Sequence, residues 1–255
     1  MNTALLLSYL GTGYHGWQRQ KNGMTFQQLI EEAVAGACGL DVSVSGCGRT
    51  DAGVHAKYYV CNFKGTTHIP LDKLPFALNA HLPPAVAVRK AVSVPETFDA
   101  RFSCVSKEYT YLFYNSRLPD PFWLDRACFC PQTLNERAMA AAAIQFIGKQ
   151  DFAAVRSVGT PVKSTVRTIC ACSVERRGPV ILIRVEADGF LYNMVRAIAG
   201  TLMYVGIGKL MPDDISEILC SRDRERAGPT APAGGLYMTA LRYGMPELDG
   251  RVDVL

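Results

Sequence analysis

The sequence feature that most constrains the fold is a glycine-rich loop between two β-type runs. The loop reads GCGRTDAGVHA over residues 46–56, with one run at 42–45 before it and another at 58–63 after it. Glycine adopts backbone angles that other residues avoid, and it lets another molecule come close to the main chain. The pattern therefore predicts a shaped loop, held between strand ends, that presents the side chains of Arg49 and Asp51.

Arg49 and Asp51 together suggest chemistry in this loop. A guanidinium two residues away favours the ionised form of a carboxylate. A single ionised carboxylate, with no second acid beside it, is typical of a nucleophile more than of an acid/base pair. The alternative is a glycine turn in which the aspartate caps its own backbone. The loop by itself leaves both interpretations open.

Composition limits the class of protein. The chain has 255 residues, of which 49% are hydrophobic and 20% are charged, as in a globular protein of one large domain or two smaller ones. The net charge of +4 fits a polyanionic partner without requiring one. No apolar stretch is long enough to span a membrane, so no membrane contact is expected.

The cysteines indicate a reducing compartment. There are nine, an odd number, and the apolar start of the chain lacks the basic residues and cleavage site of a secretory leader. A cytoplasmic location is therefore expected. No C-x-x-C spacing occurs and only four histidines are present, so no structural metal site is expected.

Hydrophobic periodicity predicts the order β-α-β-β-α-β in the first half. Thr25 and Gln28 have the spacing of a capping box, and Gly39 is expected to end the helix that they begin. The other predicted elements are a strand at 5–10, the two runs around the loop, a helix at 70–82 and a strand at 85–94.

The second half has a similar mixture. A strand is predicted at 105–115 and a helix at 133–147, begun by Thr133. The remaining predictions are strands at 165–174 and 179–186 joined by a charged turn at 175–178, helices at 190–205 and 212–221, and a strand at 236–243. The expected fold class is α+β, with two similar halves, 1–104 and 105–255, of mostly antiparallel sheet with helices on one face. A cleft between the halves is the expected site.

Arg196 and Tyr109 have two interpretations each, and three other residues are expected to have structural roles. Arg196 lies in an apolar helix, where a buried guanidinium needs a carboxylate such as Asp51, unless the side chain reaches solvent at the helix edge. Tyr109 on a strand is either a core residue or a platform for a nucleobase. His55 is expected to make a structural hydrogen bond, and Trp17, with its neighbour Tyr14, is expected to wall a loop.

Seven sequence blocks in order carry a resemblance to a known family. They are YLGTGYHGWQRQ, GRTDAGVHA, FDARFS, KEYTYLFYN, DFAAVR, FLYNMVRAIAGTL and APAGGLYM. With these blocks the chain resembles the tRNA pseudouridine synthase A family over its whole length. The chain departs from that family at Leu10, where members usually carry aspartate.

The resemblance implies a role for each candidate residue. Asp51 corresponds to the family's nucleophile, and Tyr109 to the residue that contacts the target base. Arg196 corresponds to the arginine that pairs with the aspartate. Arg49 corresponds to the residue that helps to hold the base flipped out of its helix.

The resemblance also implies an activity. Members isomerise uridine to pseudouridine at positions 38, 39 and 40 in the anticodon stem-loop of tRNA, need no cofactor, and are homodimers with RNA lying across both subunits. Whether the aspartate attacks ribose C1′ or uracil C6 stays open. Two rival functions are a glycosidase-like hydrolase, which needs two carboxylates about 5–5.5 Å apart, and a non-catalytic RNA-binding module.

Overall fold

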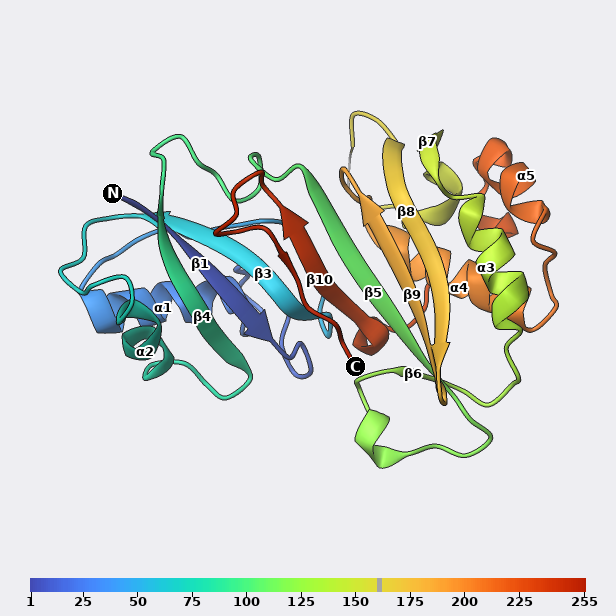
Figure 1. Cartoon of the computed structure of the whole chain (residues 1–255), viewed down its shortest axis with the longest axis horizontal. Helices are drawn as coiled ribbons and strands as arrows, with labels where there is room; N and C mark the ends of the chain where they lie inside the picture. The colour runs from blue at the N-terminus through green and yellow to red at the C-terminus, as the bar shows by residue number, and fades with distance from the viewer. Residues whose placement is uncertain (160–161) are drawn as a thin grey trace. The chain divides into compact units, whose positions relative to one another are not determined.

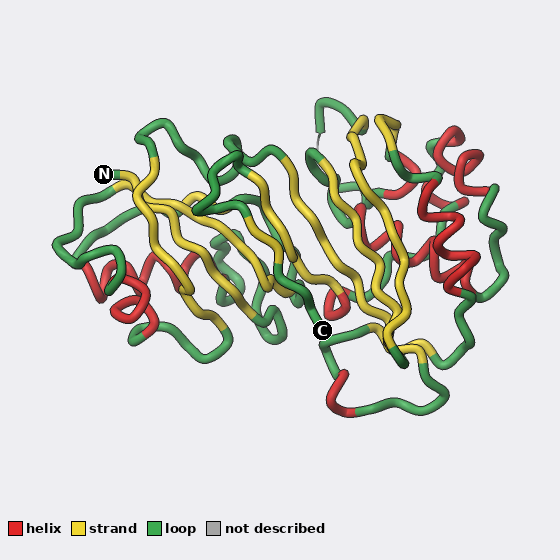
Figure 2. Tube along the Cα trace, in the orientation of Figure 1, coloured by secondary structure: helices red, strands yellow, loops and turns green. Residues whose placement is uncertain are grey.

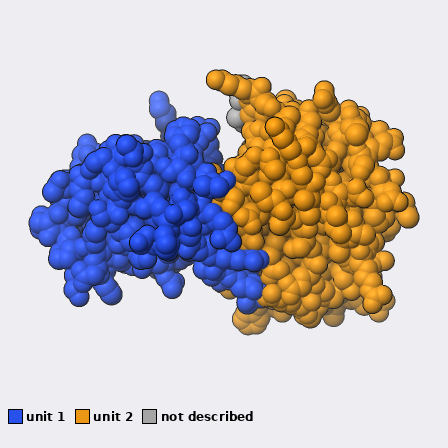
Figure 3. Space-filling model, turned by 45° about the horizontal axis from the view of Figure 1, so that its top comes forward, with its two compact units in different colours: residues 1–105, 237–255 blue, residues 106–236 orange. Residues whose placement is uncertain are grey.

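The chain folds into two compact units in a computed structural model that describes residues 1–159 and 162–255 (Figures 1 and 3). Unit 1 comprises Met1–Val105 and Tyr237–Leu255, and unit 2 comprises Ser106–Leu236. From the sequence, all residues after 104 were assigned to the second half. In the structure Tyr237–Leu255 group with the first unit, where their strand pairs in parallel with the strand that begins at His55.

Unit 1 contains a sheet of strand order β4-β1-β3-β10. Strand β1 is antiparallel to both β3 and β4, whereas β10 is parallel to β3. The elements are β1 (Asn2–Tyr9), α1 (Phe26–Cys38), β2 (Ser45–Gly46), β3 (His55–Lys64), α2 (Leu74–Asn79), β4 (Val86–Val94), β10 (Leu236–Arg242) and β11 (Gly250–Arg251). The predicted order β-α-β-β-α-β is confirmed.

The helices of unit 1 pack on this sheet through the apolar face that periodicity predicts. The ring of Phe26 at the start of α1 stacks on Tyr9 of β1, with centroids 3.9 Å apart. Helix α2 packs against α1 and β4 (Figure 2). Helix α1 ends at Gly39, whose φ of +67° closes the helix in the left-handed conformation that favours glycine.

Three local predictions in unit 1 are wrong. Thr25 precedes α1, but its buried side chain makes no capping bond, and Gln28 binds Glu32 instead. The predicted helix at 70–82 forms only as the six residues of α2. The predicted strand at 42–45 pairs only from Ser45.

Unit 2 contains a sheet of strand order β5-β9-β8-β7 in which neighbours are antiparallel. Helix α3 packs on β8 and α4, and α4 packs on β5. The elements are β5 (Ser106–Asn115), η1 (Pro121–Trp123), β6 (Cys128–Cys130), α3 (Glu136–Ile144), β7 (Gly148–Asp151), η2 (Ala153–Val155), β8 (Val166–Arg177), β9 (Val180–Ala187), α4 (Met194–Gly206), α5 (Asp214–Ser221), η3 (Arg224–Arg226) and η4 (Ala233–Gly235).

Several boundaries in unit 2 differ from the predictions. The helix predicted at 190–205 begins only at Met194, because Asn193 adopts a left-handed conformation with φ +59°, and the helix predicted at 133–147 spans Glu136–Ile144. Helix α3 is capped by Asn135, whose side-chain oxygen accepts hydrogen bonds from two backbone N–H groups of the first turn, and not by Thr133. Strand β8 continues through the predicted turn, because the Glu175 carboxylate binds Arg177 on its own strand and Arg184 on β9, both at 2.6 Å. These ion pairs offset the charges of neighbouring side chains, so that the charged segment at 175–177 can form part of a strand.

Candidate active site

Asp51 lies in the loop between β2 and β3, and its preceding residue anchors that loop to β1. The hydroxyls of Thr50 and Tyr9 share a buried hydrogen bond of 3.0 Å. The Thr50 carbonyl accepts a 3.2 Å bond from the Trp17 backbone N–H, and the Asp51 carbonyl accepts one of 3.2 Å from Val54. The backbone on both sides of Asp51 is thus fixed, while the residue itself is half-buried.

A second loop, residues 10–17, packs along the first. The backbone N–H of Gly11 donates to Nδ1 of the buried His55 at 2.8 Å. The N–H of Gly53 donates to the Tyr14 carbonyl at 3.3 Å. The structural hydrogen-bonding role predicted for His55 is confirmed, since its Nδ1 is an acceptor from the main chain.

Two glycines allow these loops to approach each other. Gly16 has a φ of +80°, and a Cβ at this position would overlap the carbonyl oxygen of Thr50. A Cβ at Gly46 would overlap the rings of Trp17 and Tyr59, whose centroids lie 4.3 Å apart. Only a residue without a side chain fits at either position, so the glycine spacing of both loops reflects their contact.

We expect Tyr9→Phe to misplace this loop. The change removes one hydrogen bond and leaves the buried Thr50 hydroxyl without that partner, at a cost of about 1–3 kcal/mol of stability. Catalysis depends on sub-ångström placement, so the kcat of the tRNA modification that the resemblance implies should fall by about tenfold. Tyr243→Phe is the control, because it removes a similar buried bond to the Ala100 carbonyl, 2.8 Å long. Equal kcat losses in the two variants would contradict the prediction.

Arg49 is exposed on the same loop as Asp51. One residue separates them, so both side chains start from a backbone segment whose position is set by the contacts described above. This arrangement is consistent with the prediction that one shaped loop presents both an arginine and an aspartate.

Tyr109 lies on β5 in unit 2 and is 7% exposed. Its ring meets that of Phe190 edge to face, with centroids 5.1 Å apart and an interplanar angle of 84°. Phe190 lies between β9 and α4. The contact sets the direction of the tyrosine ring, since edge-to-face pairs prefer this geometry.

Arg196 lies on α4, and its guanidinium is oriented by unit 2 itself. Its Nε donates to the Ala231 carbonyl at 2.7 Å, and its Nη1 donates to the side-chain oxygen of Asn193 at 2.8 Å. Asn193 has a φ of +59° and also binds the hydroxyl of Ser157 at 2.9 Å. The side chain of Arg196 is therefore held in one position by a carbonyl and an amide. Its predicted pairing with Asp51 stays a prediction.

The segment that supplies the Ala231 carbonyl crosses α4 at very short range. A Cβ at Gly200 would overlap the Pro229 carbonyl, and a Cβ at Gly228 would overlap the backbone of Gly200. The N–H of Gly228 donates to the hydroxyl of Thr201 at 3.0 Å. The two glycines thus interlock a loop and a helix, and the interlock fixes the position of Arg196.

The four predicted site residues lie two in each unit. Asp51 and Arg49 share the glycine loop of unit 1. Tyr109 and Arg196 lie on β5 and α4, which pack against each other in unit 2. The sequence analysis missed the support residue Tyr9. Its position at the end of β1, in phase with the apolar residues of that strand, was the available signal.

A groove of about 720 Å³ in unit 1 has basic walls. Lys57 and Arg89 are exposed there, and Lys90 donates from Nζ to the Glu247 carbonyl at 3.0 Å. Leu10, where the chain departs from the family pattern, also lines the groove. A basic groove with an apolar part suits a phosphate backbone with bases attached.

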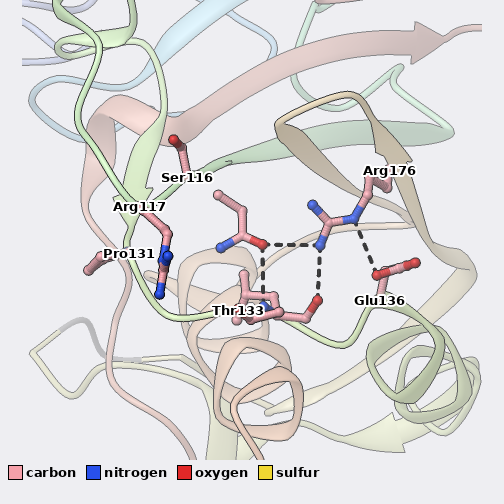
Figure 4. A pocket seen from close by; sticks show the side chains of 8 residues that line it. Ser116, Arg117, Pro131, Thr133, Glu136 and Arg176 are labelled. Atoms are coloured by element: carbon pink, nitrogen blue, oxygen red, sulfur yellow. Dashed lines mark hydrogen bonds and ion pairs between the residues drawn. The ribbon is translucent and has the colours of Figure 1, made fainter.

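A pocket of about 450 Å³ in unit 2 contains none of the predicted site residues (Figure 4). Arg176 lies on its wall and binds Glu136 at 3.2 Å, the side chain of Asn115 at 3.0 Å and the Leu134 carbonyl at 2.9 Å. These bonds tie β8, the end of β5 and the start of α3 together. The pocket is therefore part of the framework of unit 2.

No helix in the described ranges has the length and hydrophobicity that crossing a lipid bilayer demands. No group of three or more histidine, cysteine, aspartate or glutamate side chains there is placed to hold a metal ion.

A loop braced around an aspartate, on an α+β chain of largely antiparallel sheets, fits the pseudouridine synthase fold class. A family model described as tRNA pseudouridine synthase matches residues 6–103 and 142–244. The chain belongs to the tRNA pseudouridine synthase family. The matched segments contain Asp51, Arg49 and Arg196, whereas Tyr109 lies between them.

Curated relatives agree with this assignment. A protein of Acetivibrio thermocellus named tRNA pseudouridine synthase A is 45% identical over 95% of this chain and 99% of its own length. Proteins of the same name from Thermoanaerobacter sp. and Methylacidiphilum infernorum are 43% and 45% identical, over 95% and 94% of this chain and 99% and 94% of their own lengths. A solved structure titled "Crystal Structure of a Cbf5-Nop10-Gar1 Complex" has a TM-score of 0.38 at 13% identity, over 92% of this chain and 48% of that one.

Proposed function

We propose that this protein isomerises uridine to pseudouridine at positions 38, 39 and 40 of the tRNA anticodon stem-loop, with Asp51 as nucleophile. One observation carries the proposal. Asp51 occupies a backbone-braced glycine loop within the part of the chain that matches the tRNA pseudouridine synthase family. A carboxylate carried by a backbone that is held on both sides is suited to attack one defined atom.

The reaction rearranges one nucleotide. The C1′–N1 bond breaks, a C1′–C5 bond forms, and the proton on C5 leaves to water while N1 gains a proton. A carboxylate holds the nucleoside covalently while the base turns over. The atoms of substrate and product are the same, so the proposal includes no cofactor. The target base must first leave its stack, at a cost of a few kcal/mol.

The other candidate residues receive supporting roles. Arg49, exposed on the Asp51 loop, would help to hold the target base flipped out. Tyr109 would contact the target base. Arg196 would stabilise the charge of Asp51, and its bonds to Ala231 and Asn193 support this role because they orient the guanidinium in advance.

Binding of tRNA is supported by charge. The net charge is +4, and Lys57, Arg89 and Lys90 line the groove in unit 1. Contacts to phosphates release counterions, so tRNA affinity should fall steeply with salt. We also propose that the protein is a homodimer, which the family resemblance supports. A cytoplasmic location is supported by the nine free thiols. Sedimentation of the pure protein tests the oligomeric state.

The proposal is tested with tRNA that carries tritium at uracil C5. Formation of the C1′–C5 bond releases this label into water. A hydrolase would instead release free uracil that keeps its tritium, and a binding module would release nothing. Label in water with no free uracil is the expected result, and either of the other two results would overturn the proposal.

We expect Tyr109→Phe to fold as the wild type does and to lose most of its activity. The substitution keeps the ring and its contact with Phe190. It removes the hydroxyl, the group to which we assign the contact with the target base. Tyr114→Phe on the same strand is the control, since Tyr114 packs on Trp123. Thermal melting and tritium release are measured for both. A Tyr109→Phe protein that fails to fold would favour the core interpretation of this residue.

A further inference from the structure

The FDARFS block of the sequence lies in the loop between β4 and β5 and has no role in the proposed chemistry (Figure 1). Phe102 in this block is 81% exposed, one of the most exposed large apolar side chains of the described residues. The guanidinium of Arg101 lies over its ring, 5.4 Å from the centroid. The loop thus displays two flat groups, one aromatic and one cationic, to solvent.

The loop tip is rigid, which distinguishes Phe102 from an ordinary surface side chain. The Asp99 carboxylate accepts from the backbone N–H groups of Arg101 and Phe102 at 2.8 and 3.0 Å. The N–H of Asp99 donates to the Ser103 hydroxyl at 3.1 Å, and the N–H of Ser103 returns a bond of 2.9 Å to the Asp99 carbonyl. These four bonds close the turn on itself.

The base of the loop is anchored in the core of unit 1. The N–H of Ala100 donates to the buried Asn62 side chain at 2.8 Å, and the Ala100 carbonyl accepts from the hydroxyl of Tyr243 at 2.8 Å. Asn62 also donates to the side chain of Asn2 at 3.0 Å. The backbone that carries Phe102 is therefore held both by the turn and by the core, with the ring on the solvent side. Most of the ring stays in water.

Chemistry favours a nucleic acid as the partner of this pair. Nucleobases stack on aromatic rings and on guanidinium planes, and arginine over an aromatic ring presents both. The one carboxylate of the turn, on Asp99, is occupied by backbone N–H groups and so offers little repulsion to a phosphate. A rigid platform loses little conformational freedom on binding.

We propose that Phe102 and Arg101 form a stacking site for a tRNA nucleotide other than the isomerised uridine. The site increases the affinity for tRNA and helps to position it, and it takes no part in breaking or forming the glycosidic bond. This inference rests on the proposed function, because that function makes tRNA the substrate of the protein.

The test compares Phe102→Ala with Phe102→Tyr, which keeps a ring, and with Phe76→Ala. Phe76 lies on α2 of the same unit and is 74% exposed, so it is a matched control for the loss of a surface phenylalanine. For each protein we would measure the tRNA Kd at several salt concentrations, KM and kcat for tritium release, the melting temperature and the sedimentation coefficient.

Phe102→Ala is expected to raise Kd and KM between about fivefold and a hundredfold, the range for loss of one base–aromatic stack. Its kcat at saturating tRNA and its melting temperature should match the wild type. The slope of log Kd against log salt should not change, since no charge is lost, whereas Arg101→Ala should make that slope shallower. Phe102→Tyr and Phe76→Ala should bind as the wild type does.

Two results would overturn the inference. One is wild-type Kd and KM in Phe102→Ala. The other is weaker binding that accompanies dissociation into smaller species in sedimentation, which would make Phe102 a contact between protein chains. Failure of the proposed function is a separate result, since the wild-type protein would then release no tritium into water.

Discussion

Asp51→Asn is expected to reduce tritium release from C5-labelled tRNA by a factor on the order of ten thousand or more, the range for loss of a catalytic nucleophile. The amide has the same shape as the carboxylate and lacks its negative charge, so it cannot form the covalent intermediate. The loop should keep its position, because Thr50 and the backbone of Asp51 hold it without the carboxylate.

Measurement of tRNA binding distinguishes loss of the nucleophile from loss of the folded structure in this variant. The Asp51→Asn protein should bind tRNA within about tenfold of the wild type, because most affinity comes from contacts to phosphates. Asp72→Asn is the matched control, since this exposed aspartate of unit 1 pairs only weakly with Lys73, at 3.6 Å, and its loss should leave turnover unchanged. Retained turnover in Asp51→Asn would refute the assignment of the nucleophile.

Gly200→Ala is expected to cause the largest loss of stability among single-methyl changes in α4. Alanine in place of glycine normally stabilises a helix by about 1 kcal/mol. Here the added methyl group would overlap the Pro229 carbonyl, and overpacking against backbone costs about 1–3 kcal/mol or more. The overlap outweighs the gain, and we expect the melting temperature to fall by about 5 °C.

The same substitution should impair the site. Displacement of the 228–232 segment moves the Ala231 carbonyl, which binds the Nε of Arg196, so activity should fall more than the unfolded fraction explains. Gly189→Ala is the control, because its added methyl group would meet only the Arg167 side chain, at 3.7 Å. A Gly200→Ala protein as stable as the wild type would contradict the close crossing of this segment over α4.

Much of the local structure could be predicted from the sequence. The order of elements in the first half, the end of α1 at Gly39 and the bond-accepting role of His55 agree with expectation. The predicted ends of helices and strands were wrong where a residue has several possible hydrogen-bond or ion-pair partners. Asn135 caps α3 in place of Thr133, and Glu175 keeps β8 extended by binding Arg177 and Arg184.

In the candidate site, too, some features could be predicted from the sequence and others could not. The glycine spacing marked the loop around Asp51, and the polar face of an apolar helix marked Arg196. The partners that hold them were not predictable, since Tyr9 binds Thr50 from 41 residues away along the chain and Ala231 binds Arg196 from 35 residues away. No periodic pattern encodes a contact at such a separation.

The amino-acid order alone thus determined the sequence of helices and strands in the first half and which loop presents Asp51, because backbone preference and hydrophobic period are local properties. The folded chain decided that residues 10–17 brace that loop, that glycines at 200 and 228 interlock, and that β10 returns to β3. Those outcomes depend on steric fit and hydrogen bonding between distant segments, and such contacts exist only once the chain has packed.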